Sequence, residues 1–328
     1  MSELEKALHE IAIRHLGARK IEGLKRLSGG ASQETWSFSV ETDQGAERLI
    51  LRRVPRGGGN SSGTAAGLET EAKLIQLAAA AHVPVPIVRY VACPEDGLGS
   101  CFIMSHIDGE ALGAKIVRSH EFDEIRPALA RQCGEALGRL HAIAPDKLPP
   151  LRHSPAAEEL KHYESVYDAH GHPHPVFDLA FRWLEDHLPT TERLKLVHGD
   201  FRNGNIMFDP TFGVAAVLDW ELAHTGDPME DLGWICVNSW RFGSIDKPVG
   251  GFGRREDMFA GYEAVSGIKV DPERVKFWEV LGTLKWGIMC TTMYEAFKSG
   301  MDRSVERAAI GRRSSETEID LLYLIAAD

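Results

Sequence analysis

Hydrophobic positions in the first third of the chain alternate with polar ones, as they do in half-buried strands. In residues 35–40 the large apolar side chains alternate with Thr and Ser. Strand-like runs at 21–27 and 48–54 flank this segment, and the turn-forming sequences SGGAS and ETDQG separate the three runs. The pattern predicts an antiparallel meander with connections of hairpin length.

The pattern then changes four times before it becomes steadily helical. The glycine- and serine-rich residues 56–67 predict an irregular loop. A helix is expected to start near Leu68, and the apolar run 101–104 predicts another strand. Residues 105–109 break this pattern, so we expect a hinge there.

Beyond the hinge, apolar residues recur at helical spacing. Asp271 followed by Pro272 is a good helix start, because the aspartate can cap the helix and the proline has a suitable fixed φ. A strand-rich part before a helix-rich part indicates an α+β fold with two lobes, 1–104 and 105–328. The expected helices are an N-terminal one that ends before Gly17, and residues 122–143, 176–188, 228–240, 254–264, 272–297 and 304–327.

Length and composition narrow the class of protein. The 328 residues suit two coupled lobes, and 43% hydrophobic with 26% charged residues is typical of a soluble globular protein. The formal charge of −11, with no basic stripe, argues against nucleic-acid binding. No apolar stretch is long enough to span a membrane, and no signal peptide is visible. The five scattered cysteines indicate reduced thiols, so we expect a cytoplasmic protein of undetermined oligomeric state.

The segment LVHGDFRNGNIMFDP, residues 196–210, places a polar stretch between two short apolar runs. This stretch contains Asp200 and Asn205, and Asp219 follows in LDWE at the end of another strand-like run. Carboxylate and amide oxygens suit Mg²⁺, particularly together with substrate phosphates. Phosphoryl transfer needs such a metal site and a carboxylate that orients the attacking hydroxyl. The spacing Asp-x-x-x-x-Asn with a later Asp is that of a kinase catalytic loop.

The segments HGDFRNGNIMFD and AVLDWELAHTGDPMEDLGW resemble the aminoglycoside phosphotransferase-like kinases. More narrowly, they are similar to the kinase-type domain fused to some acyl-CoA dehydrogenases. Matching features extend from about Leu27 to Trp234. The resemblance implies a protein-kinase-like bilobal fold, ATP and Mg²⁺ as cofactors, and a small-molecule hydroxyl as phosphoryl acceptor.

The resemblance also implies roles for individual residues in the catalytic loop. Asp200 would be the catalytic base or hydroxyl-orienting carboxylate, and Asn205 and Asp219 would hold Mg²⁺. His198 would support the geometry of the loop.

For the nucleotide, the resemblance implies a glycine-rich hairpin over the phosphates and an adenine site in FIMSHIDG. Met104 would lie beside the adenine, which would donate a hydrogen bond to the Ser105 carbonyl and accept one from the Ile107 amide. The hairpin residues would be Ser28, Gly29, Gly30 and Ser32.

The third strand departs from the kinase pattern, because it carries Arg52 and Arg53 where kinases place lysine. Arginine can still bind phosphate, but it is bulkier than lysine and not interchangeable with it. Side chains alternate along a strand, so at most one of the two should point into the cleft. Glu71 in LETEAK would anchor that phosphate-binding cation.

Three other features favour structural interpretations. Asp227 and Asp231 are expected to cap and fix the following helix, and Pro228 supports this. His170, His172 and His174 lie among prolines and glycine, which favours a surface loop over a zinc site. Separately, the sequence contains no G-x-x-x-x-G-K-[ST] motif, which argues against a P-loop ATPase. The tryptophans at helical positions are expected in the core, with one or two of them near an acceptor: Trp183, Trp234, Trp240, Trp278 and Trp286.

Three functional hypotheses remain open. The first is a kinase of a hydroxy acid or hydroxyacyl thioester, and the second is an aminoglycoside or macrolide antibiotic kinase. The third is a nucleotide-binding pseudokinase or scaffold, which the lysine replacement alone supports. An acidic acceptor pocket would favour a polycationic antibiotic, and a basic or apolar one would favour an acyl substrate.

Overall fold

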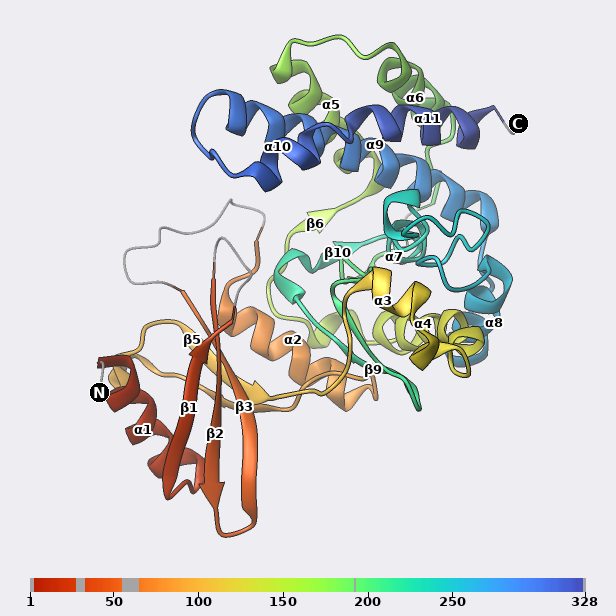
Figure 1. The fold of residues 1–328 in the computed structure, drawn as a ribbon. Coiled ribbons are helices and arrows are strands. Elements are labelled where there is room, and N and C mark those ends of the chain that lie inside the picture. Colours follow the sequence, from red (N-terminus) through yellow and green to blue (C-terminus); the bar gives the residue numbers. More distant parts are fainter. Residues whose placement is uncertain (1–2, 28–32, 55–64, 192, 327–328) are drawn as a thin grey trace.

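The computed structural model describes residues 3–27, 33–54, 65–191 and 193–326. The N-terminal part is built on a five-stranded antiparallel sheet in the order β1-β2-β3-β5-β4 (Figure 1). The three-strand meander is therefore confirmed in the described residues, although each strand is displaced by one to three residues. The elements are α1 (Glu3–Leu16), β1 (Lys20–Arg26), β2 (Glu34–Thr42), β3 (Gly45–Arg53), α2 (Leu68–Ala80), β4 (Val88–Val91) and β5 (Cys101–Ser105).

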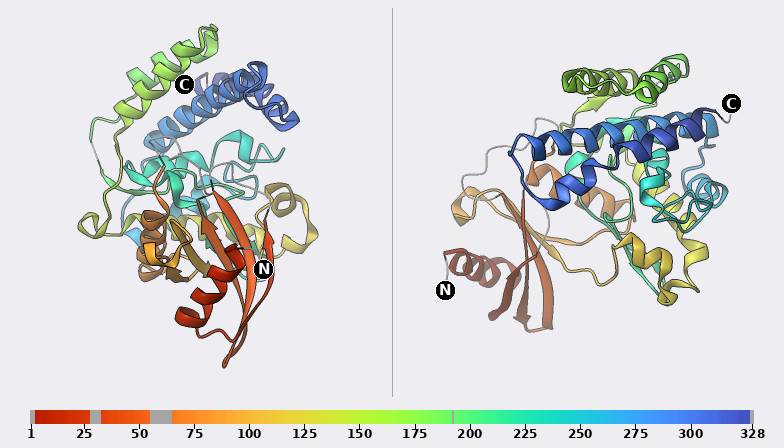
Figure 2. Two further views of the ribbon diagram at one scale, coloured as in Figure 1. Left: turned by 90° about the vertical axis from the view of Figure 1, so that its left-hand side faces the viewer. Right: turned by 45° about the horizontal axis from the view of Figure 1, so that its top comes forward.

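The alternation of side chains along β3 divides the apolar residues of the sheet between two cores. Leu49 and Leu51 pack in a smaller core with Leu8 and Ile11 of α1. Ile50 points the opposite way and joins the main core, which includes residues of α2 and of the helical part. Figure 2 shows α1 beside the sheet and away from the C-terminal helices. One face of the sheet therefore looks toward the rest of the molecule.

Two backbone hydrogen bonds attach the segments flanking α2 to the C-terminal part. Ahead of the helix, the Ala66 amide donates to the Glu221 carbonyl at 2.7 Å. Beyond it, the Val217 amide donates to the Pro84 carbonyl at 2.8 Å. Helix α2 is thus fixed at both ends to the segment that carries Asp219.

The remainder is mainly helical, with two small sheets, β6-β10-β7 and β8-β9. Long helices α4 and α8 pack together below α7, and α5, α6, α9, α10 and α11 form the opposite end (Figure 1). The elements are α3 (Gly113–Arg118), α4 (Arg126–His141), β6 (His153–Ser154), α5 (Ala156–His170), α6 (Pro175–Asp186), β7 (Lys195–Val197), β8 (Ile206–Asp209), β9 (Gly213–Val217), β10 (His224–Gly226), α7 (Met229–Trp234), α8 (Arg255–Ser266), α9 (Pro272–Lys298), α10 (Val305–Gly311) and α11 (Ser314–Ile325).

Several expected helices differ from the observed ones. The helix expected over 228–240 ends at Trp234, and a separate short turn covers Asn238–Trp240. The final helix is two helices, because α10 ends at Gly311, where a Cβ would lie 2.7 Å from the Tyr294 Cβ. The helix expected over 122–143 begins at Arg126, and α5 was not predicted at all.

Other expectations from the sequence are confirmed. The Asp271 side chain caps α9 by accepting hydrogen bonds from the Glu273 and Arg274 amides. The irregular loop expected over 56–67 and the hairpin SGGAS lie largely or wholly outside the described residues. Among the helices in the described part of the chain, none has the length and apolarity that a membrane span requires. The boundary between the lobes at residue 104 stays a prediction.

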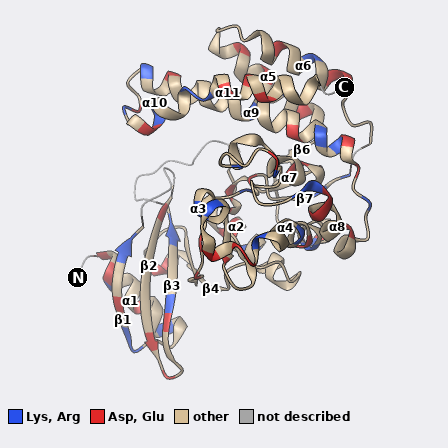
Figure 3. Cartoon of the chain, turned by 45° about the vertical axis from the view of Figure 1, so that its right-hand side comes forward, with Lys and Arg blue, Asp and Glu red and all other residues tan. Residues whose placement is uncertain are grey.

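Charged residues of both signs lie along strands β1, β2 and β3 (Figure 3). Exposed ion pairs on the sheet include Lys20 with Glu22 on β1, and Arg89 of β4 with Glu47 of β3. Exposed pairs contribute little to stability because water screens them. They do leave this surface with mixed charge.

Candidate active site

A hairpin brings the two halves of the motif together. Strand β7 leads into the loop 198–205, β8 leads out of it, and β9 pairs antiparallel with β8. The Leu218 amide then donates to the Asn205 carbonyl at 2.7 Å. The pairing therefore places Asp219 beside Asn205, as the kinase-like spacing predicted.

Asp200 lies in this loop with its side chain only 15% exposed. Its Oδ1 accepts hydrogen bonds from Arg202 Nε at 2.8 Å and Trp234 Nε1 at 2.7 Å. Its Oδ2 accepts from Asn205 Nδ2 at 2.6 Å and Arg202 Nη2 at 3.1 Å. Four donors thus converge on one carboxylate. Neither Arg202 nor Trp234 was predicted as a partner of Asp200.

The orientation of the Asn205 side chain follows from its contacts. Its Nδ2 also donates to the Asp200 carbonyl at 2.9 Å, so both neighbours of this nitrogen are acceptors. The Oδ1 must therefore point the other way, and Asn205 and Asp219 both line a cavity of about 440 Å³. Asp219 has φ of 63°, a left-handed conformation that costs a non-glycine residue about 1 kcal/mol or more. Such strain is often found at functional sites.

Arg52 enters the cleft, and Arg53 does not. Arg52 lies 2.8 Å from Glu71 Oε1 and 3.1 Å from Asp219 Oδ1, and it also donates to Gln33. Arg53 is on the other face of β3 and pairs with Glu34 at 3.1 Å. The structure thus brings Glu71 and only the first of the two arginines into the expected cluster.

Glu71 is fully buried, and this changes its acidity. Burial raises the pKa of the Glu71 carboxyl to about 7, even though the nearby Arg52 guanidinium lowers it. Desolvation disfavours the charged carboxylate more than the ion pair favours it. The Arg52–Glu71 ion pair is therefore sensitive to pH near neutrality.

The predicted adenine residues line the same cavity. It is bounded by β3 and β5 on one side and by the segments around β8 and β9 on the other. Ser28, Gly29, Gly30 and Ser32 lie outside the described residues, but Leu27 and Gln33 on either side of them line the cavity. Further lining residues include Ile50, Arg52, Met104, Ser105, Ile107, Asn205, Met207, Leu218, Asp219 and Glu221.

Asp231 holds the start of the loop 198–205. Its fully buried carboxylate accepts hydrogen bonds from the His198 amide at 2.8 Å and the Gly199 amide at 3.0 Å. His141 Nε2 lies 3.1 Å from the same carboxylate. Burial alone would raise the pKa of Asp231, but these hydrogen bonds and nearby histidine charges hold it below its usual value. The expectation that Asp231 caps the following helix is wrong, because Asp231 lies within α7 and its carboxylate bonds to the loop.

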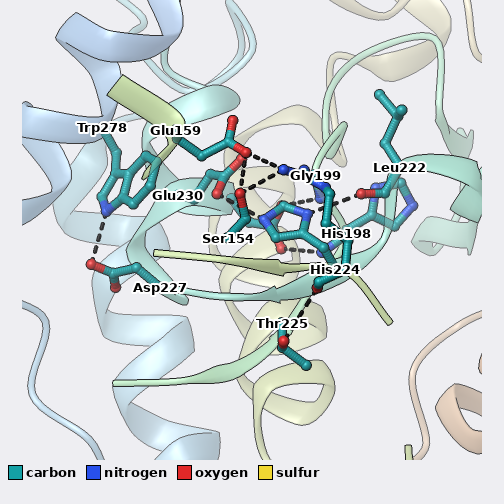
Figure 4. A network of polar contacts seen from close by, with 12 residues as sticks. Ser154, Glu159, His198, Gly199, Leu222, His224, Thr225, Asp227, Glu230 and Trp278 are labelled. Atoms are coloured by element: carbon teal, nitrogen blue, oxygen red, sulfur yellow. Dashed lines mark hydrogen bonds and ion pairs between the residues drawn. The ribbon is translucent and has the colours of Figure 1, made fainter. Parts of the chain in front are cut away.

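A second layer of polar contacts lies around the loop (Figure 4). The His198 ring nitrogen Nε2 is 3.0 Å from the Leu218 carbonyl, which links the loop to the end of β9. His224 Nε2 lies 3.1 Å from Glu230, and that carboxylate raises the His224 pKa although burial opposes it. Asp227 is not the N-cap residue of α7, which is Pro228, but it fixes the start of this helix by accepting from the Met229 amide at 3.0 Å. It also accepts from Trp278 Nε1 at 2.9 Å. These contacts fix the backbone that carries Asp200 and Asp219.

The three histidines of AHGHPHP do not converge. His170 contacts Thr292, His172 lies 3.5 Å from Glu295, and His174 lies 2.6 Å from Glu318. No group of three or more His, Cys, Asp or Glu residues in the described segments is arranged to hold a metal ion. A site that uses Asn205, Asp219 and substrate phosphates would not belong to such a group.

The sheet, the helical part and the cavity between them define a two-lobed, kinase-like class of protein. Comparison with known sequences gives the family: the chain belongs to the phosphotransferase enzyme family, whose model matches residues 23–268. The resemblance inferred from the motif is therefore confirmed.

Relatives of known sequence include mouse acyl-CoA dehydrogenase family member 10, which is 28% identical over 229 residues and 65% of this chain. Chicken acyl-CoA dehydrogenase family member 11 is 28% identical over 222 residues and 64% of this chain. The matched parts are only 20% and 27% of the lengths of these relatives.

Solved structures confirm the protein-kinase-like fold. A Ralstonia eutropha protein proposed to be an aminoglycoside phosphotransferase has a TM-score of 0.74 at 20% identity, covering 96% of this chain and 95% of its own. The macrolide 2'-phosphotransferase of Brachybacterium faecium has a TM-score of 0.61 at 18% identity, covering 94% and 97%. At these identities the likeness establishes the fold and not the substrate.

Proposed function

We propose that this protein is an ATP- and Mg²⁺-dependent kinase that phosphorylates a hydroxyl group of a small molecule. The observation that carries the proposal is that Asn205 and Asp219 line the cavity that Met104 and Arg52 also line, while Asp200 lies directly behind Asn205, accepting from its Nδ2 at 2.6 Å. Residues 1–104 would form the nucleotide-binding lobe, and residues 105–328 the catalytic and acceptor-binding lobe. The cytoplasm suits the five free cysteines.

In the proposed reaction, Asp200 accepts a hydrogen bond from the acceptor hydroxyl and orients its oxygen toward the γ-phosphorus of ATP. A bond forms between that oxygen and the phosphorus, and the bond from the phosphorus to the β,γ-bridging oxygen breaks. The hydroxyl proton passes to Asp200, and ADP leaves. Catalysis of this kind depends on positioning and on neutralising charge.

The donor set fits Mg²⁺. Asn205 offers Oδ1, since its Nδ2 is held by Asp200, and Asp219 offers a partly exposed carboxylate that contacts Arg52 through one oxygen. These two residues would hold the ion together with phosphate oxygens, because Mg²⁺ typically takes few protein ligands. When bound, the ion supplies charge neutralisation to the polyphosphate.

The remaining predicted nucleotide contacts follow from the cavity lining. Met104, the Ser105 carbonyl and the Ile107 amide would bind the adenine. Arg52 would contact the phosphates, anchored by Glu71 at 2.8 Å. Arg53 is less suited to this role because it pairs with Glu34 on the opposite face of β3. The hairpin of Ser28, Gly29, Gly30 and Ser32 would cover the phosphates.

For the acceptor, a hydroxy acid or hydroxyacyl thioester is favoured over an antibiotic. Relatives carry the name of acyl-CoA dehydrogenase family members, which fits an acyl substrate. Two acidic residues, Glu159 and Glu230, lie near the Lys285 amine, but they already pair with Arg152 and His224. The side of Asp200 that faces away from the cavity thus has little unpaired negative charge for a polycation.

The pseudokinase alternative has less support. Arg52 takes the place of lysine, yet it forms the ion pair to Glu71 that this position would need. Asp200, Asn205 and Asp219 also lie together, which a scaffold would not require.

The test is ATP consumption and product formation with a panel of hydroxy acids, hydroxyacyl-CoAs, aminoglycosides and macrolides. Asp200→Asn should lower kcat by about 10²–10⁴-fold while the fold and nucleotide binding persist. Exposed Asp246→Asn serves as the matched control and should behave as wild type. Full turnover by Asp200→Asn would refute the role of Asp200.

A further inference from the structure

All the acceptor positions of the proposed catalytic carboxylate are occupied by protein donors. An ionised aspartate has about four lone-pair sites on its two oxygens. Asp200 fills these with Arg202 Nε and Nη2, Trp234 Nε1 and Asn205 Nδ2, at 2.6 to 3.1 Å. A substrate hydroxyl needs one of these sites. Before Asp200 can orient a hydroxyl, one donor must leave.

The three residues differ in how easily they can withdraw. Asn205 Nδ2 is also held by the Asp200 carbonyl at 2.9 Å, so its departure would disturb the loop backbone. Trp234 is buried and packs edge-to-face on Trp240 at 5.3 Å between ring centroids. Arg202 is different, because its side chain is 27% exposed and its Nη1 donates to the carbonyl of the adjacent Asn203 at 2.9 Å, on the guanidinium nitrogen that does not contact Asp200. Arg202 is therefore the donor that can move.

The surroundings of Arg202 suit a second position for its guanidinium. The guanidinium carbon lies 4.5 Å from the centroid of the Trp240 ring, and this cation–π contact does not depend on the hydrogen bonds to Asp200. The tilted rings of Trp240 and Trp286 pack with their centroids 5.0 Å apart. Each side chain is more than nine-tenths buried, and neither Nε1 atom has a hydrogen-bond partner among the described residues. Two unpaired indole donors in the same cluster are suited to ligand oxygens.

The positive charges near Asp200 and Trp234 favour an anionic acceptor. Burial alone would lower the pKa of the Lys285 amine. Nearby acidic groups outweigh this effect and raise the pKa above its usual value, so Lys285 stays protonated; these groups are Tyr163, Glu230, Glu159 and Asp200. Its ammonium lies 5.0 Å from the Trp234 ring centroid. Two cations, Arg202 and Lys285, thus stand close to the carboxylate that would receive the hydroxyl.

We propose that Arg202 is a specificity-determining lock on Asp200, which the carboxylate of an anionic acceptor opens. The acceptor carboxylate takes the guanidinium fork from Asp200, which frees a lone pair for the acceptor hydroxyl. Arginine suits this exchange because its fork matches any carboxylate in bidentate fashion. The proposal rests on the proposed kinase function and adds the acceptor class: a hydroxyl-bearing carboxylic acid.

The first experiment compares a hydroxy acid with its uncharged primary amide as acceptors. Wild type should prefer the acid by about 100-fold in kcat/KM, as one bidentate charged contact supports. Arg202→Ala should reduce this preference to less than about tenfold, mainly by losing activity on the acid. Arg202→Lys, which keeps the charge and loses the fork, should lie between them. Arg254→Ala, at an exposed ion pair with Asp257, is the matched control.

The second experiment needs no acceptor hydroxyl. Asp200 freed from Arg202 can orient water, whose oxygen bonds to the γ-phosphorus as the bond to ADP breaks, with the proton passing to Asp200. A carboxylic acid without a hydroxyl should therefore stimulate ATP hydrolysis by wild type. Arg202→Ala should hydrolyse ATP faster than wild type without any carboxylate, and should not respond to one.

The outcomes separate this proposal from the proposed function. Equal loss on acid and amide with a raised KM for ATP would show that Arg202 serves the phosphates, and would overturn the lock. Phosphorylation of only uncharged or cationic acceptors would overturn it too, while leaving the kinase function intact. If wild type phosphorylates nothing in the panel, the proposed acceptor chemistry fails, and the hydrolysis experiment still decides the lock. Circular dichroism and Tm of each variant show whether it is folded.

Discussion

Replacing Asp231 with asparagine should disturb catalysis from a position that does not face the cavity. The carboxylate accepts from two loop amides and from His141, and it is fully buried. Asparagine keeps one acceptor oxygen and points an N–H₂ group at a donor. One buried charged hydrogen bond is lost and one donor is left unpaired, which costs about 2–4 kcal/mol.

This cost has two measurable consequences. For a chain of 328 residues, about 3 kcal/mol corresponds to a fall in Tm of roughly 4–5 °C, which calorimetry can measure. Displacement of the loop by about 1 Å should lower kcat by about 10²-fold with a smaller change in the KM for ATP. The matched control is Asp246→Asn, at an exposed position. A variant with the Tm and kcat of wild type would show that Asp231 does not position the loop.

Two further predictions concern the cleft. Because the Glu71 pKa is raised to about 7, protonation should weaken its ion pair with Arg52, so the KM for ATP should rise as pH falls through 7. Because the Glu71 pKa is higher in the folded protein than in the unfolded chain, ionising Glu71 also lowers the free energy of unfolding. Wild type should therefore lose stability as the pH rises from about 4.5 toward 7. Glu71→Gln should remove both pH dependences, and an unchanged acidic limb in its KM profile would contradict the assignment. Asp219→Asn should raise the Mg²⁺ concentration for half-maximal activity by at least about tenfold, because it removes a charged ligand. A Mg²⁺ titration at saturating ATP tests this, and an unaltered requirement would exclude Asp219 as a ligand.

Local sequence was sufficient for the parts of the site that a short hairpin assembles. Asn205 and Asp219 flank β8 and β9, so strand pairing alone brings them together. Alternation along β3 likewise predicted that only one of Arg52 and Arg53 enters the cleft.

Contacts between distant segments were not predictable in the same way. Trp234 and Asp231 lie on α7, far along the chain from the residues to which they are hydrogen-bonded. Trp234 is 34 positions after Asp200, and Asp231 is 32 positions after Gly199. From the sequence, Trp234 was expected in the core and Asp231 at a helix cap. Their contacts to the loop were not predicted, because tertiary packing and not sequence spacing decides which polar atoms meet. The break after Trp234 has a similar origin: Gly233 packs so closely on α9 that a Cβ would lie 2.7 Å from the Trp278 Cβ.

Helix α2 precedes the hinge in the chain, but its two anchoring hydrogen bonds join it to the backbone around Asp219. Glu71 and Asp219 are therefore held in one structural unit, whereas Arg52 lies on β3 of the sheet. If the sheet moved relative to the helical part when a nucleotide binds, the distances from Arg52 to Glu71 and to Asp219 would change. These two distances would therefore measure how far the cleft closes.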